Sequence, residues 1–456
     1  MAGWIDLLRS GAWLTAERIR RVALAVLAAC LIGACFVIAT SDGLNDRFGR
    51  PLGTDFSSFY AAGSMVRDGQ PAAVFDREAH FAREKAIFGS ATPYYSFQYP
   101  PVFLLIAAVL AQVPYPLALA LWQGATLVLY LLAIRAILLI PPPLAGEGGQ
   151  RSWSGGGPSS GIEFTPPGSS LRAEPPSPFR GGIERFWFLL ALAFPAVFVN
   201  LGHGQNGFLT AGLFGFALVA LDRRPLIAGV LFGLLAYKPQ FGLVIPLVLL
   251  ATGRWRVIAA AAATVIALVL VTLLAFGPAT WQAFFASMPF TRTVLLEQGD
   301  VGWSKIQSVF SWVRMWGGPV VVAYFVQGTV TIAVAIALAW LWRNGPRYPR
   351  QAAALLIGSL LSTPFCLDYD LMLLAPAIVF LAADGTARGF APYEKTMLAT
   401  LWIVPLVTRS IAGATSIPLA VPAMLLTFVL LLRCVIRNAS AHQTGDQSGG
   451  VLRSGA

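Results

Sequence analysis

Long apolar runs separated by short polar segments dominate the chain. The first run, 22–40, holds nineteen residues without a charge, and about twenty helical residues cross the core of a bilayer. Because lipid offers the backbone no hydrogen bonds, uncharged runs of this length are expected to be helical. The pattern predicts membrane helices over 22–40, 117–140, 185–200, 207–221, 226–250, 257–276, 320–342, 351–366, 369–383, 396–411 and 417–434.

Two apolar runs are not expected to cross the membrane in one piece. Lys238-Pro239 interrupts the run 226–250, and proline disrupts a helix because it lacks an amide N–H. We expect two half-length helices that enter from one side and return to it. The run 101–112 is short, which favours a re-entrant segment. The sequence therefore predicts an all-α polytopic membrane protein with about 11–12 membrane segments.

Three polar segments divide this pattern. Residues 42–98 form a long first outer loop, in which 54–62 reads as the start of an interfacial helix, and 277–318 form a second polar stretch. Of the 44 residues in 141–184, 26 are Pro, Gly or Ser, a composition that cannot bury enough apolar surface to fold. We expect a disordered insertion there. The expected organisation is a membrane module over 1–140, the insertion 141–184, a second membrane module over 185–437 and a disordered tail over 438–456.

Composition and charge support a membrane location and exclude nucleic acid as a partner. The chain is 57% hydrophobic and only 12% charged, about half the charged fraction of a soluble domain. Its net charge is +11, and the arginines stand at the ends of the apolar runs, where the positive-inside rule places them. This arrangement predicts a multi-pass protein of the bacterial inner membrane, with both termini in the cytoplasm and the first helix retained.

A few polar residues fall at or near membrane depth, where polar groups are costly and are candidates for function. The topology predicts that they share the outer face. They lie in four segments: Asp55; His203, Gln205 and Asn206 in a glycine-rich link; Lys238 and Gln240 at the broken helix; and Asp368 and Asp370 in the link before the helix 369–383.

Each segment also has a purely structural interpretation. Asp55 is a residue type that caps helices, and the glycine-rich link could be a plain turn. Lys238 could extend its ammonium group to the membrane surface. The two aspartates could cap a helix, pair with a cation or bind a divalent metal, whereas His203 has no second His or Cys nearby that would suggest a metal site.

Short motifs follow one another in a recognisable order over roughly 55–260. They are Asp55-Phe56, Tyr60-Ala61-Ala62, Gly69, Phe75-Asp76, Tyr99-Pro100-Pro101, Gly204-Gln205-Asn206 and the run 228–240 with Arg254-Trp255. This ordered set resembles glycosyltransferase family 87, the polyprenyl-phosphate-mannose-dependent α-mannosyltransferase-like proteins of the GT-C superfamily. The chain departs from the family at Pro364-Phe365-Cys366, where a Pro-Ser followed by aromatic and His residues is usual, and this leaves the substrate open.

The resemblance implies a GT-C fold with its active site at the outer membrane surface. It implies a hexose donor carried on polyprenyl phosphate, usually mannose, and a lipid or glycan acceptor. Asp55 matches the acidic residue of the first outer loop that acts as general base, in a single displacement with inversion. No resident cofactor is implied, although a divalent metal is possible.

The chemistry of the donor suggests roles for the remaining candidates. A leaving phosphate needs cationic and N–H donors, which favours Lys238, His203 and Gln205, with Lys305 and Arg292 as further cations of the outer loops. The expected substrate-binding residues are Tyr60, Tyr99, Asn206, Gln240, Asp368 and Asp370.

Two rival functions remain open. A transporter or flippase of lipid-linked sugars would also use broken helices and intramembrane polar groups, but it would favour an internal repeat, and none is visible between the two halves. A non-catalytic membrane scaffold is the third alternative.

Overall fold

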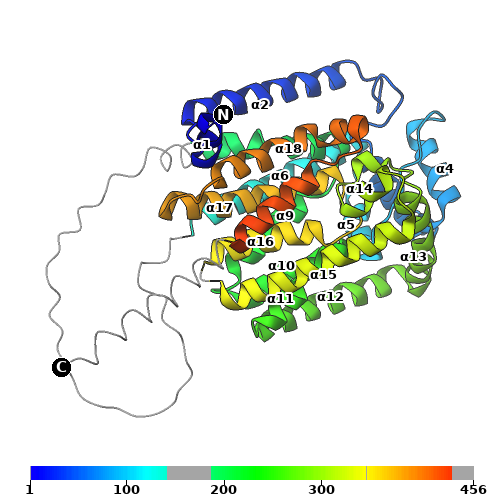
Figure 1. The fold of residues 1–456 in the computed structure, drawn as a ribbon. Helices are drawn as coiled ribbons and strands as arrows, with labels where there is room; N and C mark the ends of the chain where they lie inside the picture. Colours follow the sequence, from blue (N-terminus) through cyan, green and yellow to red (C-terminus); the bar gives the residue numbers. More distant parts are fainter. Residues whose placement is uncertain (1, 141–185, 346, 434–456) are drawn as a thin grey trace, which may run out of the picture.

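The computed structural model describes residues 2–140, 186–345 and 347–433 (Figure 1). Within these ranges the chain is helical, and extended pairing is limited to three isolated β-bridges. This confirms the all-α class predicted from the apolar runs. The predicted disordered insertion 141–184 and tail 438–456 lie outside the described residues.

Six helical segments are long and apolar enough to cross a membrane, which confirms a multi-pass protein. They are α2 (Ala16–Ala39), α6 (Tyr115–Leu138), α12 (Trp255–Phe276), α15 (Val320–Asn344), the segment Asp368–Arg388, which comprises η7 (Asp368–Leu373) and α17 (Leu374–Arg388), and α18 (Glu394–Thr415). Several of them expose most of their apolar side chains: Ala23 is the only buried residue of α2, and α12 buries only Val257 and Thr272. Such surfaces suit lipid rather than water.

The single helix predicted over 185–200 is wrong, because the chain bends there. A helix over Phe186–Leu192 is followed, after a turn of 44°, by α8 (Pro195–His203). Phe194 has an extended ψ of 121°, since the ring of Pro195 disfavours helical geometry in the residue before it. The bend directs the end of α8 toward the polar residues described below.

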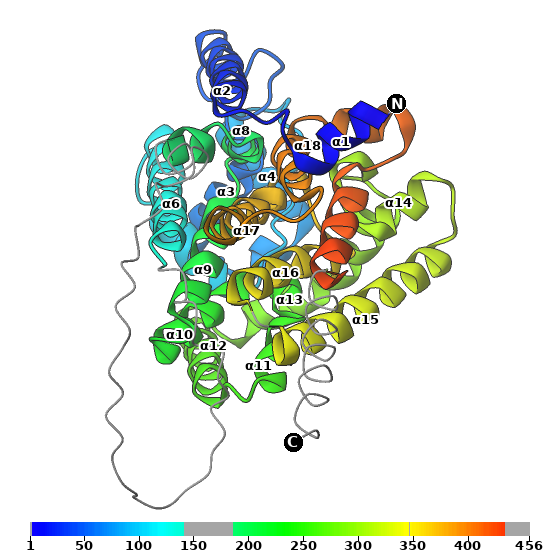
Figure 2. The ribbon, with the colours of Figure 1, turned by 60° about the vertical axis from the view of Figure 1, so that its left-hand side comes forward.

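Five shorter apolar helices complete the bundle, and they include the predicted broken helix. They are Pro101–Leu110, which contains α5 (Leu104–Leu110); α9 (Gly207–Ala220); Pro225–Tyr237, which contains α10 (Pro225–Leu234); Pro239–Ala251, which ends in α11 (Ile245–Ala251); and Ala420–Arg433. The break falls at Lys238, whose φ and ψ of −127° and 72° are not helical. The helix α16 (Tyr348–Leu361) is buried from Arg350 to Leu361, and it lies between α17 and α15 in the middle of the bundle (Figure 2).

The two polar stretches are themselves largely helical and gather at one end of the bundle. The first contains α3 (Phe56–Arg67) and α4 (Arg77–Phe88), and the second contains α13 (Pro278–Phe290), a π-helical turn (Thr291–Glu297) and α14 (Val309–Met315). In Figure 1, α4, α13 and α14 lie at the opposite end from α1 (Ala2–Ser10). The helix expected to begin within 54–62 is α3.

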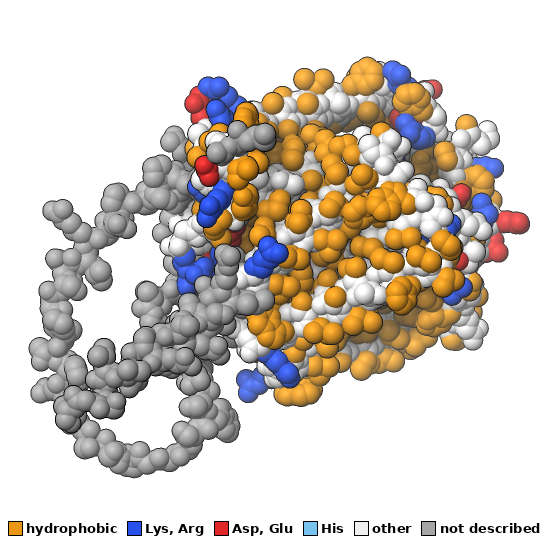
Figure 3. Space-filling view, viewed as in Figure 1, with side chains coloured by type: hydrophobic (Ala, Val, Ile, Leu, Met, Phe, Trp, Pro, Cys, Tyr) orange, Lys and Arg blue, Asp and Glu red, His pale blue; other side chains and the backbone are white. Residues whose placement is uncertain are grey.

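The arginine-rich helix ends gather at the other end, as the positive-inside pattern predicted. Arg254 pairs with Asp222 at 2.6 Å, and Arg350 bridges Asp384 at 2.8 Å and Glu394 at 3.2 Å. Figure 3 shows Lys and Arg side chains at both ends of the molecule, with hydrophobic side chains across the middle. The apolar middle therefore separates two polar ends, one formed by the arginine-rich helix ends and one by the stretches 42–98 and 277–318.

Candidate active site

Asp55 stands at the N-terminus of α3 without capping it. Its side chain accepts no hydrogen bond from the first turn of the helix, which argues against the capping interpretation, and it is 19% exposed. The segment before it packs closely against the end of α8. Gly204 has a left-handed φ of +62°, and a Cβ there would lie 2.4 Å from the Cβ of Phe56. Glycine is therefore required for this approach.

Two side chains from the glycine-rich link converge on the Asp55 carboxylate. The Gln205 amide donates a hydrogen bond from Nε2 to Asp55 Oδ2 at 3.1 Å, and His203 Nδ1 lies 3.9 Å from the same oxygen. His203 Nδ1 is also 2.9 Å from the Thr54 hydroxyl. The carboxylate is thereby oriented by a neutral donor and an imidazole, while part of it remains accessible.

Buried polar groups fix the orientation of Gln205. The Tyr99 hydroxyl donates to Gln205 Oε1 at 3.0 Å, which leaves the Gln205 NH₂ group to face Asp55. Gln123 donates to the Gln205 carbonyl at 3.3 Å, and it accepts a hydrogen bond from Asn200 at 3.2 Å. Such a network rigidifies a site, so the glycine-rich link is more than a plain turn. Asn206 beside it is fully buried, and its side chain makes no hydrogen bond.

Arg409 of α18 joins this cluster and was missed by the sequence analysis. Its Nη1 lies 3.3 Å from Asp368 Oδ2 and 3.4 Å from His203 Nε2, and its side chain is 48% exposed. The available signal was a single cation near the end of the predicted helix 396–411. Only the folded chain shows that this cation faces His203.

Lys238 and Asp370 form a buried ion pair next to this cluster. Each side chain is 2% exposed, and Asp370 also accepts the Leu367 amide at 2.9 Å. Lys238 therefore does not extend to the membrane surface, and that alternative is wrong. The Lys238 ammonium lies 4.5 Å from the centre of the Tyr369 ring, and the Tyr369 hydroxyl is 3.5 Å from that of Tyr99, which connects this pair to the Gln205 network.

The structure thus brings the four predicted polar segments together. Asp368 and Asp370 each pair with a cation, which favours one of the predicted alternatives. Among the residues that the structure describes, no group of three or more His, Cys, Asp and Glu side chains is arranged to hold a metal ion.

Other predicted residues lie at the edge of the cluster or apart from it. The Tyr60 hydroxyl donates to the Val113 carbonyl at 3.0 Å. Gln240 is half-buried in the short turn after Lys238. Arg292 is paired with Glu297 at 3.2 Å on the surface.

The first outer loop also contains a fully buried acid, which the sequence analysis did not identify. Glu84 and His80 of α4 are both fully buried, with Glu84 Oε1 3.8 Å from His80 Nε2. Glu84 Oε2 accepts the Tyr95 amide at 3.0 Å, whereas Glu84 Oε1 and both His80 nitrogens have no hydrogen-bond partner. Burial raises the pKa of Glu84 to about 8 and lowers the pKa of His80 to about 4. The charge of Asp55 adds to the rise in the pKa of Glu84, so both α4 side chains are largely neutral at pH 7.

Comparison with known proteins gives one match. Residues 97–367, more than half of the chain, match the sequence model of glycosyltransferase family 87. No curated protein and no solved structure matches the chain. The matched region contains Tyr99, the glycine-rich link and the Lys238 break, while Asp55 and Arg409 lie outside it.

Proposed function

The chain belongs to glycosyltransferase family 87, and on that premise we propose that it transfers a hexose from a polyprenyl-phosphate donor to a lipid or glycan acceptor at the outer face of the bacterial inner membrane. The observation that carries the proposal is the partly exposed Asp55 carboxylate, which is held by Gln205 and lies beside His203, whose other ring nitrogen faces Arg409. Mannose is the first donor to test.

In the proposed reaction Asp55 is the general base. The acceptor hydroxyl attacks the anomeric carbon and gives its proton to Asp55, while the bond from that carbon to the phosphate oxygen breaks. Polyprenyl phosphate leaves with the bonding electrons, and one displacement inverts the anomeric configuration. A positioned base contributes about 10²–10⁴-fold to rate. The hydrogen bond from Gln205 aims the carboxylate without neutralising it.

The leaving phosphate needs donors near this base. His203 and Gln205 are proposed for this role on the basis of the sequence, and Arg409 is added because its guanidinium is half exposed and lies 3.4 Å from His203. Guanidinium groups suit phosphate because their N–H donors match its oxygens. Lys238 stays a predicted phosphate ligand, although it is buried and engaged by Asp370.

The remaining predicted substrate contacts differ in how well they are placed. Tyr99 and Asn206 adjoin Gln205 directly, and Asp368 holds Arg409. These residues would shape the sugar and phosphate subsites. Tyr60 and Gln240 would contact substrate only at the margin. A divalent metal requirement is tested by assaying transfer with and without a chelator.

The experiment measures transfer of radiolabelled sugar to native lipid acceptor in membranes that contain wild type, Asp55→Asn or Asp68→Asn. The first donor is polyprenyl-phosphate mannose, and other polyprenyl-phosphate sugars follow. Asp68 is a matched control, because it is an acid of the same loop that pairs with Arg83 at the surface. We expect Asp55→Asn to lose about 10²–10⁴-fold in turnover, with Asp68→Asn close to wild type.

Two results would contradict the proposal in different ways. Full activity of a folded Asp55→Asn protein would place the base elsewhere. No transfer from any donor by folded wild type would favour the alternative of a lipid-linked sugar transporter or flippase, which a vesicle translocation assay then tests.

A further inference from the structure

The two ring nitrogens of His203 face groups of opposite kind. Nδ1 lies 2.9 Å from the Thr54 hydroxyl and 3.9 Å from the Asp55 carboxylate, whereas Nε2 lies 3.4 Å from Nη1 of Arg409. A guanidinium has five N–H donors and no acceptor, and it stays protonated in proteins. Nε2 must therefore accept, which places the single ring proton of a neutral His203 on Nδ1. The unligated site thus fixes one neutral tautomer of this imidazole.

Charged side chains from four elements surround this ring. Two carboxylates and two cations act on it electrostatically: Asp55 at the start of α3, Asp368 of η7, Arg409 of α18 and Lys305 of η6 (Trp303–Lys305). Arg409 is 48% exposed and also holds Asp368 at 3.3 Å. Lys305 is half-buried, and its ammonium has no hydrogen-bond or ion-pair partner among the described residues. The cationic side of the ring therefore still has N–H donors to offer to a ligand.

The link after η6 holds Lys305 on this side of the bundle. The Gln307 amide donates to the Cys366 carbonyl at 2.6 Å, and the Gln307 side-chain oxygen accepts a hydrogen bond from the Thr408 hydroxyl at 2.6 Å. Cys366 lies just before η7, and Thr408 adjoins Arg409 in α18. Two hydrogen bonds thus join the second outer stretch to both elements that supply charge to the ring.

An anion on the exposed face of Arg409 would change the role of Nε2. A lone pair on this nitrogen repels an anionic oxygen, while Thr54 and Asp55 keep Nδ1 a donor. The ring can meet both demands only as an imidazolium, in which both nitrogens donate. Without the anion, the same imidazolium would lie against the guanidinium with nothing to offset the repulsion of like charges.

We propose that His203, Arg409 and Lys305 form a site for a phosphate monoester, and that His203 takes up one proton from solvent on Nε2 when the phosphate binds. This inference rests on the proposed function and deepens it. The sugar donor is a phosphodiester with one negative charge, whereas the departing polyprenyl phosphate carries two above its second pKa of about 6. The proton on His203 would therefore meet the charge that develops as the bond to the anomeric carbon breaks.

The coupling must be reciprocal, because protonation of His203 strengthens phosphate binding by the factor by which phosphate favours protonation. If the free ring is neutral and the ligated ring is an imidazolium, the dissociation constant rises about tenfold for each unit of increasing pH. A phosphate monoester keeps its double negative charge between pH 7.5 and 8.5, so this change would report the protein alone.

The first measurement is ¹⁵N NMR of the full chain in lipid, labelled at histidine, at pH 7.5. The chain has three histidines, and His203→Gln identifies the signal of this one by its loss. We expect a neutral ring protonated on Nδ1 in the free protein, and a doubly protonated ring with saturating farnesyl phosphate, a short polyprenyl phosphate. A proton on Nε2 in the free protein, or a neutral ring in the ligated one, would overturn the proposal.

The second measurement is calorimetric titration with farnesyl phosphate at pH 7.5 and 8.5. Wild type should bind about tenfold more weakly at the higher pH, and His203→Gln should bind equally at both. Arg409→Gln should lose at least tenfold in affinity at pH 7.5. The matched control is Arg50→Gln, because Arg50 is also 48% exposed and pairs with an aspartate at 3.2 Å; it should bind like wild type. Full pH dependence in His203→Gln, or wild-type affinity in Arg409→Gln, would refute the site.

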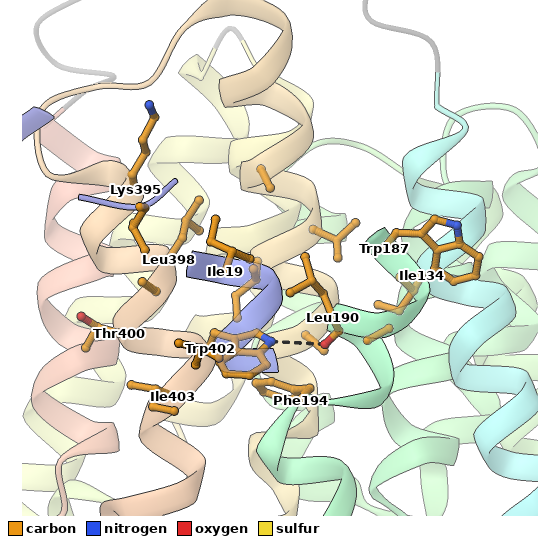
Figure 4. A pocket seen from close by; sticks show the side chains of 18 of the residues that line it. Ile19, Ile134, Trp187, Leu190, Phe194, Lys395, Leu398, Thr400, Trp402 and Ile403 are labelled. Carbon is orange, nitrogen blue, oxygen red and sulfur yellow. Dashed lines mark hydrogen bonds between the residues drawn. The ribbon is translucent and has the colours of Figure 1, made fainter. Parts of the chain in front are cut away.

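Other modes of binding give different results. Sulfate has no prenyl chain and should bind more weakly but with the same pH dependence; binding of sulfate that does not vary with pH would contradict the proposal. The apolar cavity of about 360 Å³ in Figure 4 is also lined by α18, at Leu398 and Trp402. Leu398 is 11 residues from Arg409, about 16 Å along the helix, so a ligand held only there would leave His203 neutral.

The two proposals fail in different ways. Proton-coupled binding of farnesyl phosphate by a protein that transfers no sugar would contradict the proposed function alone. Sugar transfer by a protein whose His203 stays neutral with farnesyl phosphate bound would contradict this inference alone.

Discussion

Replacing Glu84 by glutamine should flatten the pH dependence of stability in the alkaline range. The buried carboxyl of Glu84 has a pKa of about 8 in the fold, against an ordinary value of 4.5, mainly because burial disfavours its charged form. Glutamine has nearly the same shape and can accept the same hydrogen bond from the Tyr95 amide, but it cannot ionise. The variant therefore removes the titration while leaving the packing intact.

Proton linkage gives the sign and the size of the change in the free energy of unfolding with pH. A carboxyl whose pKa is raised by folding stabilises the fold fully below pH 4.5, and this contribution is lost as pH rises through about 8. At about 1.4 kcal/mol per pH unit, the loss amounts to about 5 kcal/mol over the whole interval. Between pH 6.5 and 8 it is about 2 kcal/mol. His80 does not interfere above pH 6.5, because its depressed pKa of about 4 confines its own contribution to lower pH.

The assay is denaturant unfolding of both proteins in detergent, followed by tryptophan fluorescence at pH 6.5, 7.25, 8 and 8.75. The free energy of unfolding of Glu84→Gln minus that of wild type cancels the other titrating groups. This difference should grow by about 2 kcal/mol from pH 6.5 to 8 and then level off. If the free energy of unfolding changes with pH in the same way for both proteins, Glu84 is not a buried, neutral carboxyl in the fold.

Two further substitutions test packing near the site. Lys238→Met should cost about 3–5 kcal/mol of stability, because it leaves the carboxylate of Asp370 buried without its cation. In thermal unfolding, the double variant Lys238→Met/Asp370→Leu should recover a large part of the lost stability. If the costs of the two single substitutions simply add in the double variant, the ion pair is not coupled and the reasoning fails. Gly63→Ala should lower the melting temperature by disrupting the contact of α3 with α5, since a Cβ would lie 2.0 Å from the Ala107 carbonyl oxygen. The control Gly328→Ala should melt close to wild type, because a Cβ there would meet nothing within 4 Å. Equal melting temperatures for the two alanine variants would contradict this close contact.

Much of the architecture could be predicted because hydrophobic length is a local property. Runs of about twenty uncharged residues have few alternatives to a membrane helix, and Lys238-Pro239 marks its own break. Arg254 and Arg350 were correctly expected at the same end because charge at helix ends follows a simple rule. The sequence also indicated that Asp55, His203 and Gln205 would share one face.

Other features depend on how the helices are rotated against one another. The bend at Phe194 was missed because Pro195 is also compatible with the first turn of a helix. Arg409 was missed because only the packing of α18 turns its guanidinium toward His203 and Asp368.

The sequence by itself determined that this is an α-helical membrane protein and which polar residues stand at its helix ends and breaks. The tertiary structure decided which of them meet: Gln205 with Asp55, Lys238 with Asp370, and a buried Glu84 beneath an apparently solvated loop. The reason is physical. Hydrophobic burial depends on the composition of each segment, whereas hydrogen bonds and ion pairs depend on distances of a few ångströms that only the packed chain defines.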